Sequence, residues 1–520
     1  MARKTAAPKK EISLEAALWA SADKLRGGVE PAEYKHVVLS LFFLRFANDK
    51  FEAQRQKLIA DGKERYLEIK EFYTKDNIFY VPEESRWGYI MSQAKQDDIA
   101  LKIDTALSSL EEQNPALKGA LPDNYYSRLE LEPAKLGSLL DSVNDIPRTD
   151  GETDIIGRVY EYFLTHFALK EGKGKGEFYT PKTVVKLIAE MIEPYSGVVY
   201  DPCCGSGGMF VQSAEFVKNH AGSTKDIAIY GQEYTATTFK LAKMNLAIRG
   251  ISANLGEAPR NTFSNDQHKD LKADFIMANP PFNQKEWRED SELLDDPRWD
   301  GFVVPPTGNA NYGWILHMLS KLSQNGVAGF LLANGALSSS GDEQTIRSML
   351  VERDLIEAIL VLPQNLFYTT DISVTLWILN RNKKARTVVR NDGTKTYRDR
   401  SGEVLFMDLR NMGTPYEKKY IELGDEEREK ITSVFHEWRL DGGSYEDIPE
   451  FCYSATKQEI AEKEYFLAPS RYIEFLKTEN EFDFDEKMSA IRQGLGKAME
   501  ASEKSKAALL NILEELGYGI

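Results

Sequence analysis

The chain has 520 residues, more than one ordinary hydrophobic core holds, so we expect two or three domains. Hydrophobic residues make up 42% of the sequence and charged residues 28%, which is typical of a soluble globular protein. The net charge of −16 argues against a protein that holds DNA alone through phosphate contacts, because such a surface is normally basic. Either the partner is not nucleic acid, or another chain supplies much of the electrostatic attraction.

No stretch of the sequence is predicted to span or enter a membrane. The longest apolar run, Val37–Leu44, is much shorter than the ~20 residues that a bilayer requires. Residues Met1–Lys10 are basic but lack an apolar stretch behind them, so we interpret them as a disordered tail and not as a secretory signal.

Cysteine and histidine usage predicts a cytoplasmic protein without a structural metal. Cys203, Cys204 and Cys452 cannot form a disulfide framework, and the adjacent pair lacks a second pair at zinc spacing. The histidines are scattered singly along the chain. We therefore expect a reducing compartment and no metal ligands.

The region 11–165 is predicted to be mainly helical. Apolar residues recur at helical spacing over Tyr34–Phe51, Ile99–Leu110 and Ile155–Leu169, and prolines interrupt the connections between these segments. No residue of this region suggests catalysis.

After the glycine- and lysine-rich segment 172–176, short β-rich runs alternate with amphipathic helices. The predicted strands are Val198–Tyr200, Ile227–Tyr230, Phe275–Ala278, Val327–Leu332, Ile356–Leu362 and Val374–Leu379. The predicted helices include Thr183–Ile192, Val211–Asn219, Thr235–Ile248, Trp314–Leu322 and Thr345–Glu352. This alternation predicts an α/β fold with a doubly wound parallel sheet. The last two strands are too close in sequence for another long crossover, so we expect them to be partly antiparallel.

The C-terminal part of the chain is more polar. Residues 383–420 are rich in charge, with one strand expected at Val404–Met407, and Phe484–Leu516 has apolar residues at helical spacing. That helix could pack on a partner or fold back on its own domain. The predicted domains are a tail (1–10), a helical domain (11–165), a catalytic domain (166–475) and a C-terminal helical partner-binding segment (476–520).

The strongest chemical signal is Asn279-Pro280-Pro281-Phe282, which directly follows a predicted strand. Ligands bind at the carboxyl ends of strands in such sheets. The prolines stiffen the loop and remove N–H donors, which leaves the Asn279 side-chain oxygen and the Pro280 carbonyl as acceptors beside an aromatic ring.

This loop suits a planar amino group such as that of adenine. Two acceptors on its hydrogens would free the nitrogen lone pair for attack, and the Phe282 ring could stack on a base that has left the duplex. The alternative is a tight turn that ends a strand, with Phe282 in the core.

A second signal is the glycine-rich segment Asp201–Phe210, between a predicted strand and a helix. Its glycines permit positive φ angles and let a ligand touch the backbone, but it matches neither the dinucleotide fingerprint nor a Walker loop. Glu233 lies at the tip of the next predicted strand, where ribose hydroxyls are held in nucleotide-binding sheets. A tight turn and a solvated surface glutamate are the respective alternatives.

A third signal is Glu177-Phe178-Tyr179-Thr180-Pro181-Lys182, directly before a predicted helix. Thr180 and Pro181 form an N-cap and first-turn pair, so simple helix initiation accounts for them. Capping does not explain the aromatic pair ahead of them.

Together these motifs resemble the N6-adenine DNA methyltransferases, in the order Phe-Tyr-Thr-Pro, glycine loop and Asn-Pro-Pro-Phe. More narrowly, the chain resembles the modification subunit of a type I restriction–modification system. The resemblance extends from residue 11 onward and includes the stretch 367–373 and the tail segment 451–472. Cys203 and Cys204 depart from the small residues that the family often has there, although cysteine is small enough to fit.

The resemblance implies S-adenosyl-L-methionine as the cofactor and a Rossmann-like catalytic sheet. Its implied cofactor-binding residues are Glu177, Phe178, Tyr179, Thr180, Pro181, Lys182, Asp201, Gly205, Ser206, Gly207, Gly208 and Glu233. Asn279, Pro280, Pro281 and Phe282 would hold a flipped-out adenine, whose N6 would attack the methyl group directly, without metal.

The implied partners are double-stranded DNA, a separate specificity subunit that recognises the target sequence, a second copy of this chain, and a restriction or translocase subunit. A partner of this kind would also account for the acidic composition. The DNA target is not readable from the sequence. Two other functions stay open: methylation of a protein glutamine, which uses similar loops, and a non-catalytic scaffold.

Overall fold

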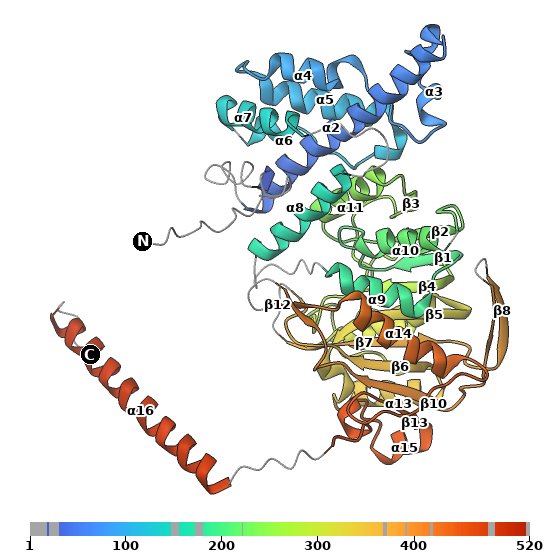
Figure 1. The fold of residues 1–520 in the computed structure, drawn as a ribbon, viewed down its shortest axis with the longest axis vertical. Helices are drawn as coiled ribbons and strands as arrows, with labels where there is room; N and C mark the ends of the chain where they lie inside the picture. Colours follow the sequence, from blue (N-terminus) through green and yellow to red (C-terminus); the bar gives the residue numbers. More distant parts are fainter. Residues whose placement is uncertain are drawn as a thin grey trace, which may run out of the picture. The chain divides into compact units, whose positions relative to one another are not determined.

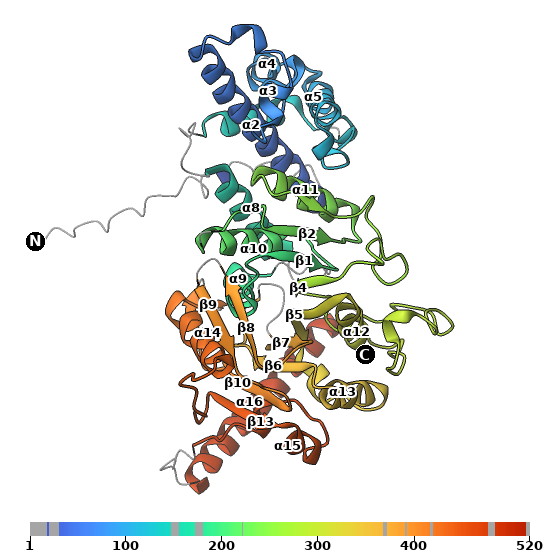
Figure 2. The same ribbon diagram turned by 90° about the vertical axis from the view of Figure 1, so that its right-hand side faces the viewer.

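The structure is a computed structural model, shown in Figures 1 and 2. It describes residues 18–19, 31–129, 131–146, 155–171, 180–220, 222–367, 372–390, 393–416, 420–476 and 484–515. The chain divides into two compact units, a large one, Met1–Ile473, and a small one, Glu474–Ile520. No helix within the described ranges is long and apolar enough to cross a membrane.

The N-terminal part of the large unit is helical, as predicted. Its α-helices are α2 (Pro31–Ala60), α3 (Glu71–Thr74), α4 (Trp87–Gln93), α5 (Ile99–Gln113), α6 (Tyr125–Arg128), α7 (Pro133–Asn144) and α8 (Ile155–Glu171). Buried Asp104 accepts backbone N–H bonds from Tyr125, Tyr126 and Ser127, so a carboxylate caps the start of α6.

The hydrophobic core of these helices continues into the catalytic region. The same cluster that contains Phe42, Trp87 and Tyr126 also contains Leu241 and Met244 of α11 (Ala236–Ile248). The predicted boundary at 165/166 falls inside α8, a single helix. The domain division therefore stays a prediction.

The catalytic region contains a sheet of nine strands in the order β13-β10-β6-β7-β5-β4-β1-β2-β3. They are β1 (Gly197–Asp201), β2 (Ile227–Gly231), β3 (Ala253–Asn254), β4 (Ala273–Ala278), β5 (Leu322–Ala333), β6 (Ile356–Val361), β7 (Val374–Asn380), β10 (Glu403–Asp408) and β13 (Cys452–Thr456). β4, β1, β2, β3 and β5 run parallel, whereas β7 is antiparallel to β5 and β6. The expected antiparallel pairing of the last two predicted strands is confirmed.

Helices cover both faces of the sheet (Figure 2). One face carries α9 (Lys182–Ile192), α10 (Gly208–Asn219), α11 and α14 (Asp425–Arg439), and the other carries α12 (Asn311–Lys321) and α13 (Asp342–Glu352). α9 lies very close to β5, since a Cβ on Gly329 would stand 2.8 Å from the side chain of Ile188. The predicted α/β fold with a doubly wound sheet is confirmed.

The charged region 383–420 holds more structure than the single strand predicted there. β8 (Arg386–Arg390) and β9 (Gly393–Tyr397) form an antiparallel hairpin, and β11 (Thr414–Tyr416) pairs with β12 (Tyr420–Glu422). Two basic side chains of the hairpin pair with one carboxylate elsewhere in the fold. Glu193, at the end of α9, accepts hydrogen bonds from Arg390 at 2.5 Å and from Lys395 at 2.8 Å. Burial raises the pKa of Glu193, but His436, Arg390, Arg439 and the bond from Lys395 lower it to about 2.

The small unit contains α16 (Phe484–Glu515), the helix that was predicted over Phe484–Leu516. Several of its apolar side chains are exposed, among them Met488, Ile491, Leu495, Met499, Leu509 and Ile512.

Candidate active site

Three loops leave the same edge of the sheet. β1 and β4 are parallel neighbours with Tyr200 opposite Ile276, and β1 and β2 are parallel with Asp201 opposite Gly231. The segments after these strands therefore meet at the carboxyl edge, where ligands bind in open α/β sheets. These segments carry the glycine loop, Glu233 and the Asn279–Phe282 loop.

The glycine loop uses backbone conformations that side chains disfavour. Gly205 has φ +54° and Gly207 has φ +80°, both in the left-handed region. Added Cβ atoms on Gly205 and Gly208 would meet nothing within 4 Å, so the loop borders open space. Helix α10 starts at Gly208, earlier than the predicted Val211, so the last glycine of the loop is already its first residue.

Asp201 is a buried carboxyl at the base of this loop. Burial, together with the nearby Glu233 carboxylate, raises its pKa to about 7. The backbone N–H of Cys203, which donates to it at 3.0 Å, opposes this shift. Two carboxyl groups so close together favour a cationic ligand, because a positive charge would relieve their mutual repulsion.

Glu233 links the second loop to the first. Its carboxylate accepts the backbone N–H of Gly205 at 3.1 Å and that of Thr235 at 2.7 Å. The structure thus brings together the two sequence signals that were predicted to share one ligand. Tyr234 beside it is 70% exposed, although it is a large aromatic residue.

The Asn279–Phe282 loop follows β4 as predicted. The Asn279 side chain is 9% exposed, and its Nδ2 donates to Thr180 Oγ1 at 2.9 Å. Its Oδ1 is buried and has no hydrogen-bond partner among the described residues. A buried acceptor left unpaired costs stability, so this oxygen has the signature of a ligand-binding atom.

Phe282 is half-buried and contacts another aromatic ring. Its centroid lies 6.2 Å from that of Phe367, with the planes inclined by 77°. This edge-to-face contact is a favoured aromatic geometry, and it fixes the orientation of the Phe282 ring.

The third predicted motif is only partly described. Glu177, Phe178 and Tyr179 lie outside the described residues, whereas Thr180 contacts Asn279 as above. Lys182 instead faces α8, with its Nζ 3.4 Å from Glu161 Oε1. A cavity of about 30 Å³ beside it, bordered by Thr180 and Ser206, has room for little more than a water molecule.

Sequence reasoning missed a fourth segment at this edge, the loop 260–263 after β3. The Arg260 N–H donates to the Glu233 carbonyl at 3.0 Å, and the Thr262 hydroxyl donates to the Pro202 carbonyl at 2.6 Å. The rule that parallel strands present their carboxyl ends together could have identified this loop. It was missed because β3 has only two residues.

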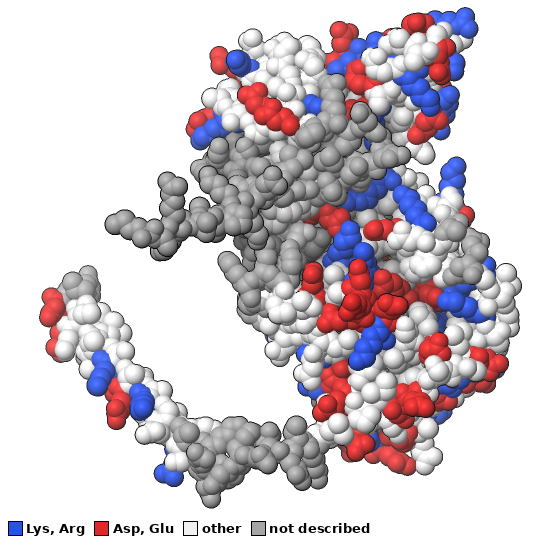
Figure 3. All heavy atoms as spheres, viewed as in Figure 1, with Lys and Arg blue, Asp and Glu red and all other residues white. Residues whose placement is uncertain are grey.

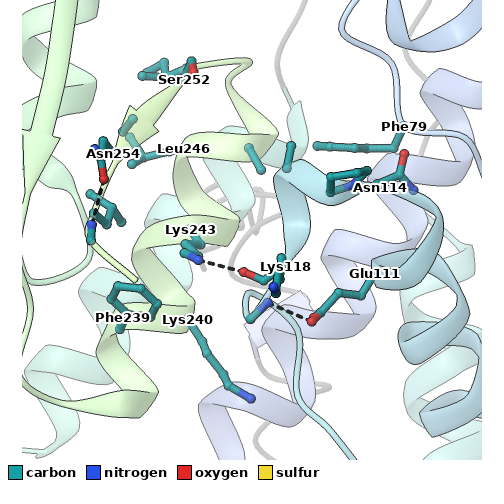
Figure 4. Close-up of a pocket in the computed structure, with 18 of the residues that line it drawn as sticks. Phe79, Glu111, Asn114, Lys118, Phe239, Lys240, Lys243, Leu246, Ser252 and Asn254 are labelled. Carbon is teal, nitrogen blue, oxygen red and sulfur yellow. Dashed lines mark hydrogen bonds between the residues drawn. The ribbon is translucent and has the colours of Figure 1, made fainter. Parts of the chain in front are cut away.

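A separate cleft of about 1210 Å³ lies between the helical region and α11 (Figure 4). None of the predicted site residues borders it. Two of its lysines bond to backbone carbonyls: Lys243 donates to that of Lys118 at 2.7 Å, and Lys240 donates to that of Leu121 at 3.0 Å. These bonds join the two regions.

The strand order, the glycine loop and the acceptor-rich loop after β4 fit the methyltransferase that the sequence motifs resemble. Comparison with known proteins gives the same class. Residues 151–481 match the family model described as N-6 DNA Methylase, and residues 14–143 match the HsdM N-terminal domain.

Two relatives align over most of their length. The chain is 41% identical to the type I restriction enzyme HindI methylase subunit of Haemophilus influenzae, over 83% of this chain and 95% of that protein. It is 35% identical to the MjaIX methylase subunit of Methanocaldococcus jannaschii, over 96% and 91%. A solved type I methyltransferase subunit from Streptococcus thermophilus shares the fold, with a TM-score of 0.73, 24% identity, and coverage of 89% of this chain and 99% of that one.

The chain therefore belongs to the N-6 DNA methylase family, and within it to the methylase subunits of type I restriction enzymes. It is an adenine-specific DNA methyltransferase and a modification subunit, as the resemblance implied. The alternatives of a glutamine methyltransferase and of a scaffold find no support in these comparisons.

Proposed function

We propose that the chain transfers the methyl group of S-adenosyl-L-methionine to N6 of an adenine rotated out of a DNA duplex. In this proposal Asn279–Phe282 hold the base, and Glu177–Lys182, Asp201, Gly205–Gly208 and Glu233 form the cofactor site. The observation that carries the proposal is the buried, unpaired acceptor Asn279 Oδ1 among the described residues at the end of β4.

The described residues fit a cationic, ribose-containing cofactor. Open space beside Gly205 and Gly208 leaves room for a ligand against the backbone. The carboxylate of Glu233 can accept ribose hydroxyl donors, and the buried carboxyl of Asp201 gains a favourable partner when a cation binds. The exposed ring of Tyr234 lies next to Glu233 and offers a flat apolar surface for a nucleobase.

The base site works by accepting hydrogen bonds. S-adenosyl-L-methionine supplies a methyl group activated by a sulfonium. Asn279 Oδ1 and the Pro280 carbonyl accept hydrogen bonds from the two N6–H groups of adenine. These bonds draw the N6 lone pair out of conjugation with the ring. The N6–C bond would form as the C–S bond breaks, with the electron pair left on sulfur as a neutral thioether, and N6 would then lose a proton to water. Phe282, held by Phe367, stacks on the base.

We infer that the chain acts with a specificity subunit, a second copy of itself and a restriction subunit. The net charge of −16 supports dependence on a partner for DNA binding. On the face shown in Figure 3, basic and acidic side chains of the described residues are intermingled and form no separate basic face. The exposed apolar residues of α16 offer a surface for such a partner.

A reconstitution experiment tests this proposal. The chain is assembled with its specificity subunit and incubated with tritiated S-adenosyl-L-methionine and double-stranded DNA. We expect label in N6-methyladenine and no incorporation by the isolated chain. Label in cytosine or in protein would contradict the proposed chemistry, and DNA methylation by the isolated chain would contradict the dependence on a partner.

The raised pKa of Asp201 predicts a pH-dependent cofactor affinity. Because the ionised carboxylate favours a cation and its pKa is about 7, binding should strengthen as pH rises through that value. From pH 6 to pH 8 we expect Kd to fall about tenfold, measured by calorimetry. The Asp201→Asn variant controls for titration of the cofactor's own amino group, and an equally steep profile in that variant would exclude Asp201 as the cause.

A further inference from the structure

The backbone directly after the base-holding loop is held in an uncommon conformation. Asn283 has φ +51°, in the left-handed region that non-glycine residues rarely adopt. Since Pro280 and Pro281 have no N–H, the loop has few donors of its own with which to anchor itself. Asn283, immediately after Phe282, does have an N–H, and this N–H donates to Asn311 Oδ1 at 3.1 Å.

Asn311 returns a second bond to the same residue. Its Nδ2 donates to Asn283 Oδ1 at 3.0 Å, so the two asparagines are joined by a reciprocal pair of hydrogen bonds. A neighbouring bond, from the Ala310 N–H to the Gln284 carbonyl at 2.9 Å, fixes the next step of the backbone. Together these bonds hold residues 283–284 against the start of α12.

Asn311 itself is firmly placed. It is the first residue of α12 and is 1% exposed, and its own N–H donates to Asn309 Oδ1 at 3.0 Å. The next residue, Tyr312, is fully buried and donates to the Ala336 carbonyl at 2.7 Å. The buried start of α12 therefore fixes the position of the Asn311 side chain, which bonds to the loop.

We propose that Asn311 is a positioning residue for methyl transfer. It fixes the loop on the far side of Phe282, as Thr180 fixes it at Asn279, so that the Asn279 oxygen, the Pro280 carbonyl and the Phe282 ring keep one geometry. The inference rests on the proposed role of Asn279–Phe282. Asn311 acts through the backbone of Asn283, and it does not itself touch the base or the cofactor.

The test uses the assembled complex and the Asn311→Leu variant, which removes both bonds while keeping a similar volume. Single-turnover methyl transfer should slow about 10- to 100-fold, because small displacements of reacting groups have effects of that size. The Kd of S-adenosyl-L-methionine should stay within about twofold, because the glycine loop and Glu233 are untouched. Asn311→Asp, which keeps the acceptor for the Asn283 N–H but loses the donor, should show a smaller loss of rate.

Asn114 supplies a matched control. It is 2% exposed, and like Asn311 it exchanges two hydrogen bonds with a single residue. Its partner is the backbone of Tyr80, at 2.9 Å for each bond. Asn114→Leu should lower thermal stability as Asn311→Leu does, without slowing methyl transfer. Equal loss of rate in the two variants, or a loss of cofactor affinity that parallels the loss of rate, would show a structural role only and overturn the inference.

The same complex separates this inference from the proposed function. If Asn279→Ala slows transfer strongly and Asn311→Leu does not, the positioning role of Asn311 is wrong while the role of the loop stands. If Asn279→Ala transfers methyl groups at the wild-type rate, the assignment of the loop to the base is wrong.

Discussion

Replacing Asn279 with alanine should slow methyl transfer to DNA by about 10²- to 10³-fold, the size of effect seen when a preorganised polar group is removed from a reacting centre. The reason is the loss of Oδ1, which is buried and unpaired among the described residues. The substitution removes one hydrogen bond, from Nδ2 to Thr180 Oγ1, so folding stability should fall by about 1 kcal/mol. The rate is measured in a single turnover of the assembled complex, with thermal unfolding followed in parallel.

A second substitution tests the Asn279 oxygen separately from the hydrogen bond that holds its side chain. Thr180→Val removes the hydroxyl that accepts from Asn279 Nδ2 at 2.9 Å but leaves the Asn279 oxygen in place. We expect a smaller loss of rate than in Asn279→Ala, since the acceptor stays and only its orientation loosens. Wild-type turnover by Asn279→Ala, with cofactor and partners present, would show that the loop takes no part in methyl transfer.

The loops of the candidate site that follow β1, β2 and β4 could be predicted from the sequence. A buried strand followed by Asn-Pro-Pro-Phe, and another followed by a glycine-rich turn, are local patterns, and the parallel sheet then brings them to one edge. The bond between Gly205 and Glu233 joins two segments only 28 residues apart. Each of these steps depends on residues close together in the chain.

The remaining features depend on partners far away in the sequence. Arg390 of the β8–β9 hairpin pairs with Glu193, 197 residues earlier, so a charged stretch that looks solvated becomes an ordered hairpin. The contact of Lys182 with Glu161 of α8 was not predicted either, because the two residues lie in separate segments of the sequence. Asn311 also belongs to no motif of the sequence, because its role comes only from its hydrogen bonds to Asn283 in the folded chain.

Placing charge on the apolar side of α16 should abolish assembly with the specificity subunit. Ile491 and Leu495 are more than half exposed, at 55% and 60%, which is costly for apolar side chains unless a partner covers them. Burying each on a partner would contribute about 1.5–3 kcal/mol, so Ile491→Glu with Leu495→Glu should weaken association at least a hundredfold. Co-purification and analytical ultracentrifugation measure the assembly.

The control for this prediction lies on the same helix. Glu503→Lys changes a charged residue and keeps the helix-forming character of the sequence, so assembly should persist. Because α16 belongs to a unit separate from the active site, the double variant should still bind S-adenosyl-L-methionine with wild-type affinity. Normal assembly of the double variant, or of a chain lacking Phe484–Ile520, would show that the partner binds elsewhere. Loss of both assembly and cofactor binding would instead point to a folding defect, so measuring the two together distinguishes a docking helix from a structural one.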